Sequence, residues 1–210
     1  LMAFFGVSIP REVQPSLVKE VARRCVLGSQ LTPVFCGAAY RNMGIQTLLD
    51  AVVDYLPSPL DRGEAIGTRP SDPLESETRR PTSDEPFSCL AFKVIHDPYV
   101  GQQTFVRTYS GILRPGSQGL NTSTGRKERV SRVLRIHAKS RQDLGEVGPG
   151  DIVALIGPKN TLTGHTLCDP SAPILLESVQ VPIPVISVKV AAGGSKEEDR
   201  LHESLKHLSL

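Results

Sequence analysis

Two N-terminal segments carry apolar residues at helical spacing. Residues 15–27 begin with Pro15, which suits a first helical turn because its missing N–H would have no partner there. The apolar positions of this segment are Leu17, Val18, Val21 and Cys25. A second stripe consists of Ile45, Leu48, Leu49, Val52, Val53 and Leu56. Both patterns predict amphipathic helices, and the second is expected to end at Pro57-Ser58-Pro59.

A short apolar run, Leu31–Cys36, lies between the two predicted helices. Its length and composition predict a buried strand, although Pro33 restricts it to the start of a strand or to an edge. A strand, a loop and an amphipathic helix in this order are typical of the closing unit of an α/β domain.

Residues 61–85 have a different character. Prolines alternate there with Ser, Thr, Glu, Asp and Arg, and large apolar side chains are few. This composition predicts an interdomain linker or a mobile loop. A charged recognition tail is the alternative interpretation.

From Phe87 to about Val190 the pattern is typical of an all-β domain. Short runs rich in Val, Ile, Phe and Thr occur at 90–95, 104–109, 130–136 and 152–156. Turn sequences separate them, namely Ser110-Gly111, Arg114-Pro115-Gly116, Thr124-Gly125, Gly148-Pro149-Gly150-Asp151 and Thr163-Gly164. This rhythm of strands and turns predicts a small closed β-barrel.

The last residues predict one strand followed by one helix. Ile183–Val190 is strand-like, and Ser195 with Glu198 matches a helix capping box before an apolar face at Leu201, Leu205 and Leu208. A lone strand and helix cannot bury a core of their own. Because the sequence also starts with Leu1, we expect both ends to be cuts in a longer protein.

Composition and charge narrow the class of protein only slightly. Hydrophobic residues make up 39% and charged residues 22% of the 210, with a formal net charge of +2, which is typical of a globular chain. Charge alone therefore does not indicate nucleic-acid binding, and DNA is not an expected partner. No apolar run approaches the ~18 residues of a membrane span. The four cysteines form no C-x-x-C pair, so we expect buried, reduced thiols.

Three stretches carry a family resemblance. Pro33–Gln46, continuing through Leu48–Pro59, resembles the end of the GTPase domain of elongation factor G. Residues 91–101 with 109–111 resemble the second domain of that family, a barrel shared with elongation factor Tu, and so do Arg126–Val130, Gly150–Ile152 and Thr163–Asp169. Pro184–Ser187 resembles the beginning of the third domain.

The resemblance implies a piece of a ribosomal translocase, a mainly β fold in which a domain II barrel is flanked by parts of two other domains. The implied limits are 1–60 for the end of the GTPase domain, 61–85 for the linker, 86–185 for the barrel and 186–210 for the start of domain III. The implied parent hydrolyses GTP with Mg²⁺ and acts on the ribosome in the cytoplasm or in an organellar matrix.

The resemblance also implies a guanine-side motif at Gly37, Ala38, Ala39 and Tyr40, with Ala38 where the family has Ser. A phosphate loop, G-x-x-x-x-G-K-[ST], is missing from the sequence, as is N-K-x-D. The nearest mimic, Gly157–Thr166, has wrongly spaced glycines and His165 in place of the lysine. We therefore expect neither catalytic residues nor bound GTP in this chain, and the small residues at 37–39 fit a simple turn equally well.

For the barrel, the resemblance implies contact with rRNA of the small ribosomal subunit. The candidate residues are Arg126, Lys127, Arg129 and Arg132. Because Arg132 shares strand parity with Val130, it is expected to pack or pair inward. Charges that protect a solvated strand edge are the alternative interpretation of the whole group.

Neither a metal site nor a catalytic triad is expected, because the five histidines are scattered. His165 stands where the family has Asp, so polar contacts at that position are in question. Together with Ala38, it leaves a ribosome-recycling or ribosome-protection paralogue as an alternative parent. An alternative of another class is a stand-alone, non-enzymatic RNA- or ribosome-binding barrel.

Overall fold

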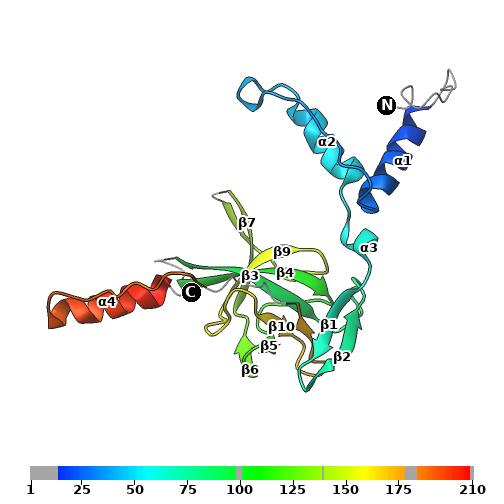
Figure 1. The fold of residues 1–210 in the computed structure, drawn as a ribbon. Helices are drawn as coiled ribbons and strands as arrows, with labels where there is room; N and C mark the ends of the chain where they lie inside the picture. Colours follow the sequence, from blue (N-terminus) through cyan, green and yellow to red (C-terminus); the bar gives the residue numbers. More distant parts are fainter. Residues whose placement is uncertain (1–13, 98–100, 139, 178–183, 209–210) are drawn as a thin grey trace. The chain divides into compact units, whose positions relative to one another are not determined.

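A computed structural model describes residues 14–97, 101–138, 140–177 and 184–208 (Figure 1). The chain divides into two units, residues 1–62 and 63–210. Helices form the described part of the first unit, and strands dominate the second. The mainly β fold class predicted from the sequence is confirmed.

The first unit contains both predicted helices, α1 (Pro15–Leu27) and α2 (Ile45–Tyr55), with a short 3-10 turn η2 (Ala39–Arg41) and α3 (Pro59–Arg62). Ion pairs connect these helices. Lys19 Nζ lies 2.6 Å from Asp54 Oδ2, and the Arg23 guanidinium reaches the Asp54 carbonyl at 2.9 Å and Asp61 Oδ2 at 2.6 Å. The apolar stripes are largely exposed, and Ala51 is the only buried residue among those described in this unit.

The strand predicted over 31–36 is wrong, since residues 31–37 have no regular secondary structure. Val34 is 86% exposed. A strand needs neighbouring strands to satisfy its backbone N–H and C=O groups. In the described part of this unit the only β-bridge joins Ala38 to Met43, which leaves residues 31–37 without such a neighbour.

Eight strands form the main sheet of the second unit. They are β3 (Ser88–Asp97), β4 (Gly101–Ser110), β5 (Gln118–Asn121), β6 (Arg126–Arg129), β7 (Arg132–His137), β8 (Ser140–Asp143), β9 (Ile152–Ile156) and β10 (Thr166–Cys168). Their order is β6-β5-β10-β3-β4-β9-β7-β8, and every pair is antiparallel. The strands predicted at 90–95, 104–109 and 152–156 all lie within this sheet.

The sheet curves around one hydrophobic core, and the chain passes directly from β6, at one end of the sheet, to β7, the strand next to its other end. Only Val130 and Ser131 separate β6 from β7. The Val130 N–H donates to the Ser117 carbonyl at 3.0 Å, and the Ser131 N–H donates to the Ile156 carbonyl at 2.7 Å. The enclosed core consists of Phe87, Cys89, Ala91, Val106, Leu113, Val130, Val133, Val147, Val153, Leu155 and Leu167. The predicted barrel is therefore present in outline, although no ladder pairs β6 with β8 among the described residues.

The linker predicted over 61–85 is wrong over most of its length. β1 (Ala65–Arg69) and β2 (Asp72–Arg79) form an antiparallel hairpin, and β1 also pairs with β11 (Leu175–Leu176) in a second sheet. The sequence did not predict this hairpin, because proline and charged residues are uncommon in strands. Pro70 lies in its two-residue turn, and its charged side chains pair across the strands.

The hairpin helps to enclose a second apolar cluster. Cys168, Ile174 and Leu176 are buried there, and Ala65 of β1 packs against them with Leu90, Tyr109 and Leu120. Cys168 alternates with Leu167, which belongs to the main core, so the two clusters lie on opposite faces of β10. The outer face of the barrel is thus covered here by part of the predicted linker.

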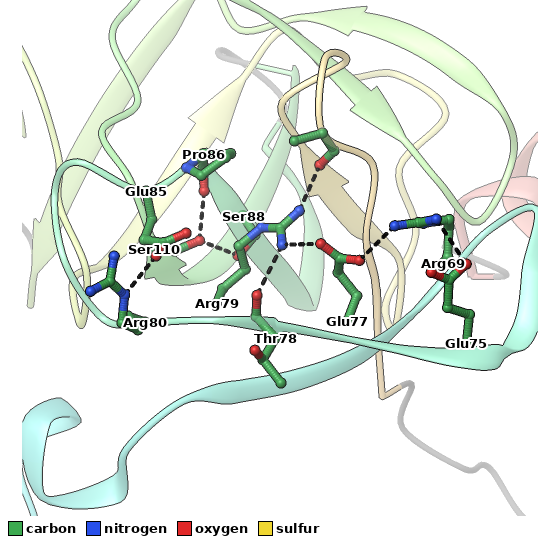
Figure 2. A network of polar contacts seen from close by, with 11 residues as sticks. Arg69, Glu75, Glu77, Thr78, Arg79, Arg80, Glu85, Pro86, Ser88 and Ser110 are labelled. Carbon is green, nitrogen blue, oxygen red and sulfur yellow. Dashed lines mark hydrogen bonds and ion pairs between the residues drawn. The ribbon is translucent and has the colours of Figure 1, made fainter.

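Arg79, at the end of β2, anchors the hairpin (Figure 2). Its side chain is 6% exposed and donates to Glu77 Oε1 at 2.7 Å, the Thr78 carbonyl at 2.9 Å and the Ala172 carbonyl at 3.2 Å. Glu77 also accepts from Arg69 at 3.2 Å, and Arg69 reaches Glu75 at 2.8 Å. The bond from Arg79 lowers the pKa of Glu77 below its usual value, so this carboxylate stays charged beside the two arginines.

The C-terminal prediction is correct for the helix and wrong for the strand. α4 (Ser195–Leu208) forms, but residues 184–190 have no regular secondary structure, and Ile183 lies outside the described residues. Val185 is 97% exposed. Within the described ranges no helix is both long and apolar enough to cross a membrane.

The packing of β1 against β11 generates a first prediction. A Cβ on Gly67 would lie 2.5 Å from the Leu175 carbonyl oxygen and 2.8 Å from Ile174 Cγ1. Gly67→Ala should therefore lower the free energy of unfolding by about 1–3 kcal/mol, as overpacking does. Urea-induced unfolding measures this change. Gly119→Ala is the control, because its Cβ would meet nothing closer than 3.7 Å. Equal losses in both variants would mean that the hairpin is not packed as described.

Candidate functional site

The predicted guanine-side motif lies in a loop closed by its own backbone. The Ala38 N–H donates to the Met43 carbonyl at 3.0 Å, and the Met43 N–H donates to the Ala38 carbonyl at 3.1 Å. A Cβ on Gly37 would lie 2.9 Å from the Met43 carbonyl oxygen, so the loop itself requires a small residue there. Ala39 begins the 3-10 turn, and Tyr40 is fully exposed. What this loop offers a ligand is backbone groups and one aromatic ring.

Three of the four predicted RNA contacts lie together on β6, at one end of the main sheet. Arg126, Lys127 and Arg129 are all exposed. Within the described ranges none of their side chains has a carboxylate partner, and Arg126 Nη1 donates to Asn160 Oδ1 at 3.4 Å. We call these three residues the β6 rim. Its cations are free to meet an external anion.

Arg132, the fourth predicted contact, lies on β7 and is already paired. Its Nε and Nη2 donate to the two Asp143 carboxylate oxygens at 2.9 and 2.8 Å. This bidentate bond raises the pKa of Arg132 and lowers that of Asp143. The prediction that Arg132 packs or pairs inward is wrong, because strand parity breaks at the bend and its partner Asp143 is exposed. Ser131 and Arg132 are both exposed, and Val133 and Leu134 are both buried.

Glu128, in the middle of the β6 rim, points the other way. It is 6% exposed, and its carboxylate accepts hydrogen bonds on both oxygens. Oε2 accepts from the Lys159 N–H at 2.6 Å and from the Asn160 N–H at 2.9 Å. Oε1 accepts from Thr161 Oγ1 at 2.8 Å and from Asn121 Nδ2 at 3.4 Å. The negative charge of the strand is thus held inside by the loop that follows β9.

Asn121 and His165 extend this buried network. Asn121 Oδ1 accepts from the backbone N–H groups of Ser123 and Thr124 at 3.1 and 3.2 Å, and its Nδ2 lies 3.2 Å from His165 Nδ1. His165 Nδ1 also accepts from the Leu162 N–H at 3.1 Å. Because Nδ1 acts as the acceptor, the neutral ring carries its proton on Nε2. The departure from Asp at this position therefore still provides a polar contact that closes the loop.

Sequence reasoning missed Glu128 and Asn121. A glutamate between Lys127 and Arg129 has the composition of a solvated surface, and composition says nothing about the direction of its side chain. The available signal was the strand alternation, because a residue between two outward-facing cations faces inward. Elsewhere, the described residues hold no group of three or more potential metal ligands.

The cysteine prediction is half correct. Cys89 and Cys168 are buried, Cys25 is partly buried and Cys36 is exposed. Burial raises the pKa of the Cys89 and Cys168 thiols above the ordinary value, which keeps them protonated and unreactive. Although β3 and β10 are paired, Cys89 and Cys168 face different clusters.

Comparisons with known proteins identify relatives of this fold. Residues 86–170 match the family model described as elongation factor G domain 2. Over 199 residues, or 95% of this chain, the sequence is 45% identical to elongation factor G of Salinibacter ruber (strain DSM 13855 / M31), of which it spans 28%. A crystal structure of a Thermus thermophilus protein matches 94% of the chain with a TM-score of 0.70 and 25% identity, and 27% of that protein is covered.

The buried network generates a prediction about stability. Glu128→Ala removes the acceptor of two backbone N–H groups and leaves them unsatisfied, so it should lower the free energy of unfolding by roughly 3 kcal/mol. Glu146→Ala is the control, because Glu146 is exposed and pairs with exposed Arg114. Such a surface pair contributes only about 0–1 kcal/mol. Urea-induced unfolding measures the loss of free energy of unfolding in each variant. Equal losses would mean that the Glu128 carboxylate does not satisfy the loop N–H groups as described.

Proposed function

Because this chain belongs to the elongation factor G family, we propose that it is part of a ribosomal translocase and carries the barrel that contacts rRNA of the small subunit. The parent protein hydrolyses GTP with Mg²⁺ and acts where ribosomes translate, in the cytoplasm or in an organellar matrix. Residues 1–60 are the end of the GTPase domain, 86–185 the barrel and 186–210 the start of domain III. The hairpin at 65–79 belongs with the barrel.

The observation that carries this proposal is the β6 rim. Arg126, Lys127 and Arg129 lie exposed on one strand, and the only acid of that strand is turned inward. A row of cations without competing carboxylates suits a phosphodiester backbone, because each one can displace a condensed counterion. Contacts of this kind fix register and orientation without reading sequence. They therefore fit a domain that positions a motor on a fixed RNA surface.

The alternative of a stand-alone barrel is less well supported. The similarity to the Salinibacter ruber protein extends over 95% of the chain, and the family model covers only residues 86–170. The helical unit before the barrel thus shares the ancestry of the larger protein.

GTP binding by this chain alone is not expected. Phosphate recognition needs backbone donors, a lysine and a magnesium ligand from a phosphate loop, and the sequence lacks that motif. Titration of the 210-residue chain with GTP and Mg²⁺ in a calorimeter should produce no saturable heat. The full-length parent serves as the positive control. A stoichiometric micromolar site in the isolated chain would overturn the assignment.

The salt dependence of ribosome binding tests whether the β6 rim contacts phosphates. In the full-length protein, Arg126→Ala/Lys127→Ala/Arg129→Ala should weaken ribosome binding, because three candidate phosphate ligands are removed. The slope of log affinity against log salt should fall by roughly one unit for each phosphate that is no longer bound. Equilibrium binding at several salt concentrations measures both quantities.

The matched control removes the same charge from cations that are already paired. Arg69→Ala/Arg80→Ala/Arg114→Ala replaces three arginines of the same unit, each of which bonds a carboxylate at 2.8–2.9 Å. We expect a smaller change in slope. If the two triple variants gave the same slope, or if the rim variant matched the wild type, the rim would not be the contact.

A further inference from the structure

We infer that Lys159 is a fourth phosphate-binding residue of the β6 rim and that buried Glu128 is the residue that places it there. This inference rests on the proposed function and extends it to the loop after β9. Lys159 is exposed, and it is separated by 30 residues of sequence from the nearest rim cation, so sequence proximity does not reveal it. The structure brings it to β6 through its backbone N–H, which donates to the Glu128 carboxylate.

The carboxylate of Glu128 is the link between loop and strand. It accepts from the Lys159 and Asn160 N–H groups at 2.6 and 2.9 Å, and from Thr161 Oγ1 at 2.8 Å. Three consecutive loop residues are therefore bonded to one side chain of β6. Thr161 is completely buried, whereas Lys159 and Asn160 are exposed. The loop is fixed from within, and its outer side chains remain available to a ligand.

The first half of the loop lies against β6 and the bend that follows it. At its start, Gly157 has φ 120°, and a Cβ there would collide with the Arg129 carbonyl oxygen and with Ser131. Further along, Asn160 Oδ1 accepts from Arg126 Nη1 at 3.4 Å. Residues 157–160 therefore follow β6 from Arg129 to Arg126, and Lys159 lies between these two contacts. The loop thus places Lys159 beside Arg126, on the side of β6 that carries Glu128.

The role of Glu128 can be distinguished from simple electrostatics by the sign of its effect. Neutralising an acid beside three cations raises the local positive potential, which on its own would tighten binding to RNA. Glu128→Gln replaces one of the two acceptor oxygens by an NH2 donor, so the four donors that share the carboxylate compete for a single oxygen and the bonds to the Lys159 and Asn160 N–H groups weaken. If Glu128 places the loop, Glu128→Gln weakens binding although the protein becomes more positive.

The experiment uses the full-length protein and measures ribosome affinity as a function of salt for Lys159→Ala, Glu128→Gln and the double variant. We expect Lys159→Ala to reduce the log–log slope by about one unit. Glu128→Gln should weaken binding with a similar loss of slope, and the double variant should lose no more slope than either single variant. Lys93→Ala is the matched control, since Lys93 is an exposed barrel lysine on β3.

Two results would overturn the inference, namely a Lys159→Ala slope equal to that of Lys93→Ala, or tighter binding by Glu128→Gln. Lys159→Ala changes only an exposed side chain and should fold, so it decides the first point even if Glu128→Gln is unstable. The triple rim variant separates this inference from the proposed function. If the triple variant loses slope and Lys159→Ala does not, the rim cations bind phosphate and Lys159 does not. If the triple variant loses none, the proposed function itself fails.

Discussion

The passage of the chain from β6 to β7 through Val130 and Ser131 is the constraint on which the barrel depends. The Val130 N–H donates to the Ser117 carbonyl, just before β5, and the Ser131 N–H donates to the Ile156 carbonyl at the end of β9. One end of the sheet, β6, is thereby connected to β7, which lies next to the other end, and no ladder pairs β6 with β8 among the described residues. The bend also breaks strand parity, which turns Arg132 outward to Asp143 and keeps it apart from the rim cations. Gly157 packs against this bend, so the loop after β9 follows from the same geometry.

A second constraint acts on the outer face of the barrel. Cys168 and its apolar neighbours are covered there by Ala65 of β1 and Leu176 of β11. The hairpin that helps to cover them is itself held by Arg79, whose buried guanidinium donates to the Ala172 carbonyl, a few residues before β11. A buried arginine is tolerated here because Glu77 neutralises it and two carbonyls accept its N–H groups. The small sheet is thus part of the folded unit, although its sequence has the composition of a linker.

The sequence predicted those elements whose signal is local. The stripe from Ile45 to Leu56 specifies α2, and the Val- and Ile-rich runs between turn residues specify β4 and β9. The sequence-based predictions were wrong where secondary structure depends on pairing with residues far away in the chain. Residues 31–36 have strand composition but no neighbouring strand among the described residues, whereas 65–79 have linker composition and pair with each other and with β11. The rim cations were found because they are contiguous in sequence. Glu128 and the loop that it holds were missed because their contact spans more than 30 residues.

The proposed phosphate-binding surface around β6 combines two properties, a fixed backbone and available cations. Lysine and arginine side chains lose conformational entropy when a ligand fixes them, so a surface whose other parts are ordered before binding has less entropy left to lose. Here that order lies in the backbone. Glu128 and Asn121 hold the strand and the loop from the inside, and the cations outside keep their rotamers until a ligand engages them. An acid in a basic strand would normally weaken attraction for RNA. Turned inward and satisfied by backbone N–H groups, it organises the surface that it would otherwise oppose.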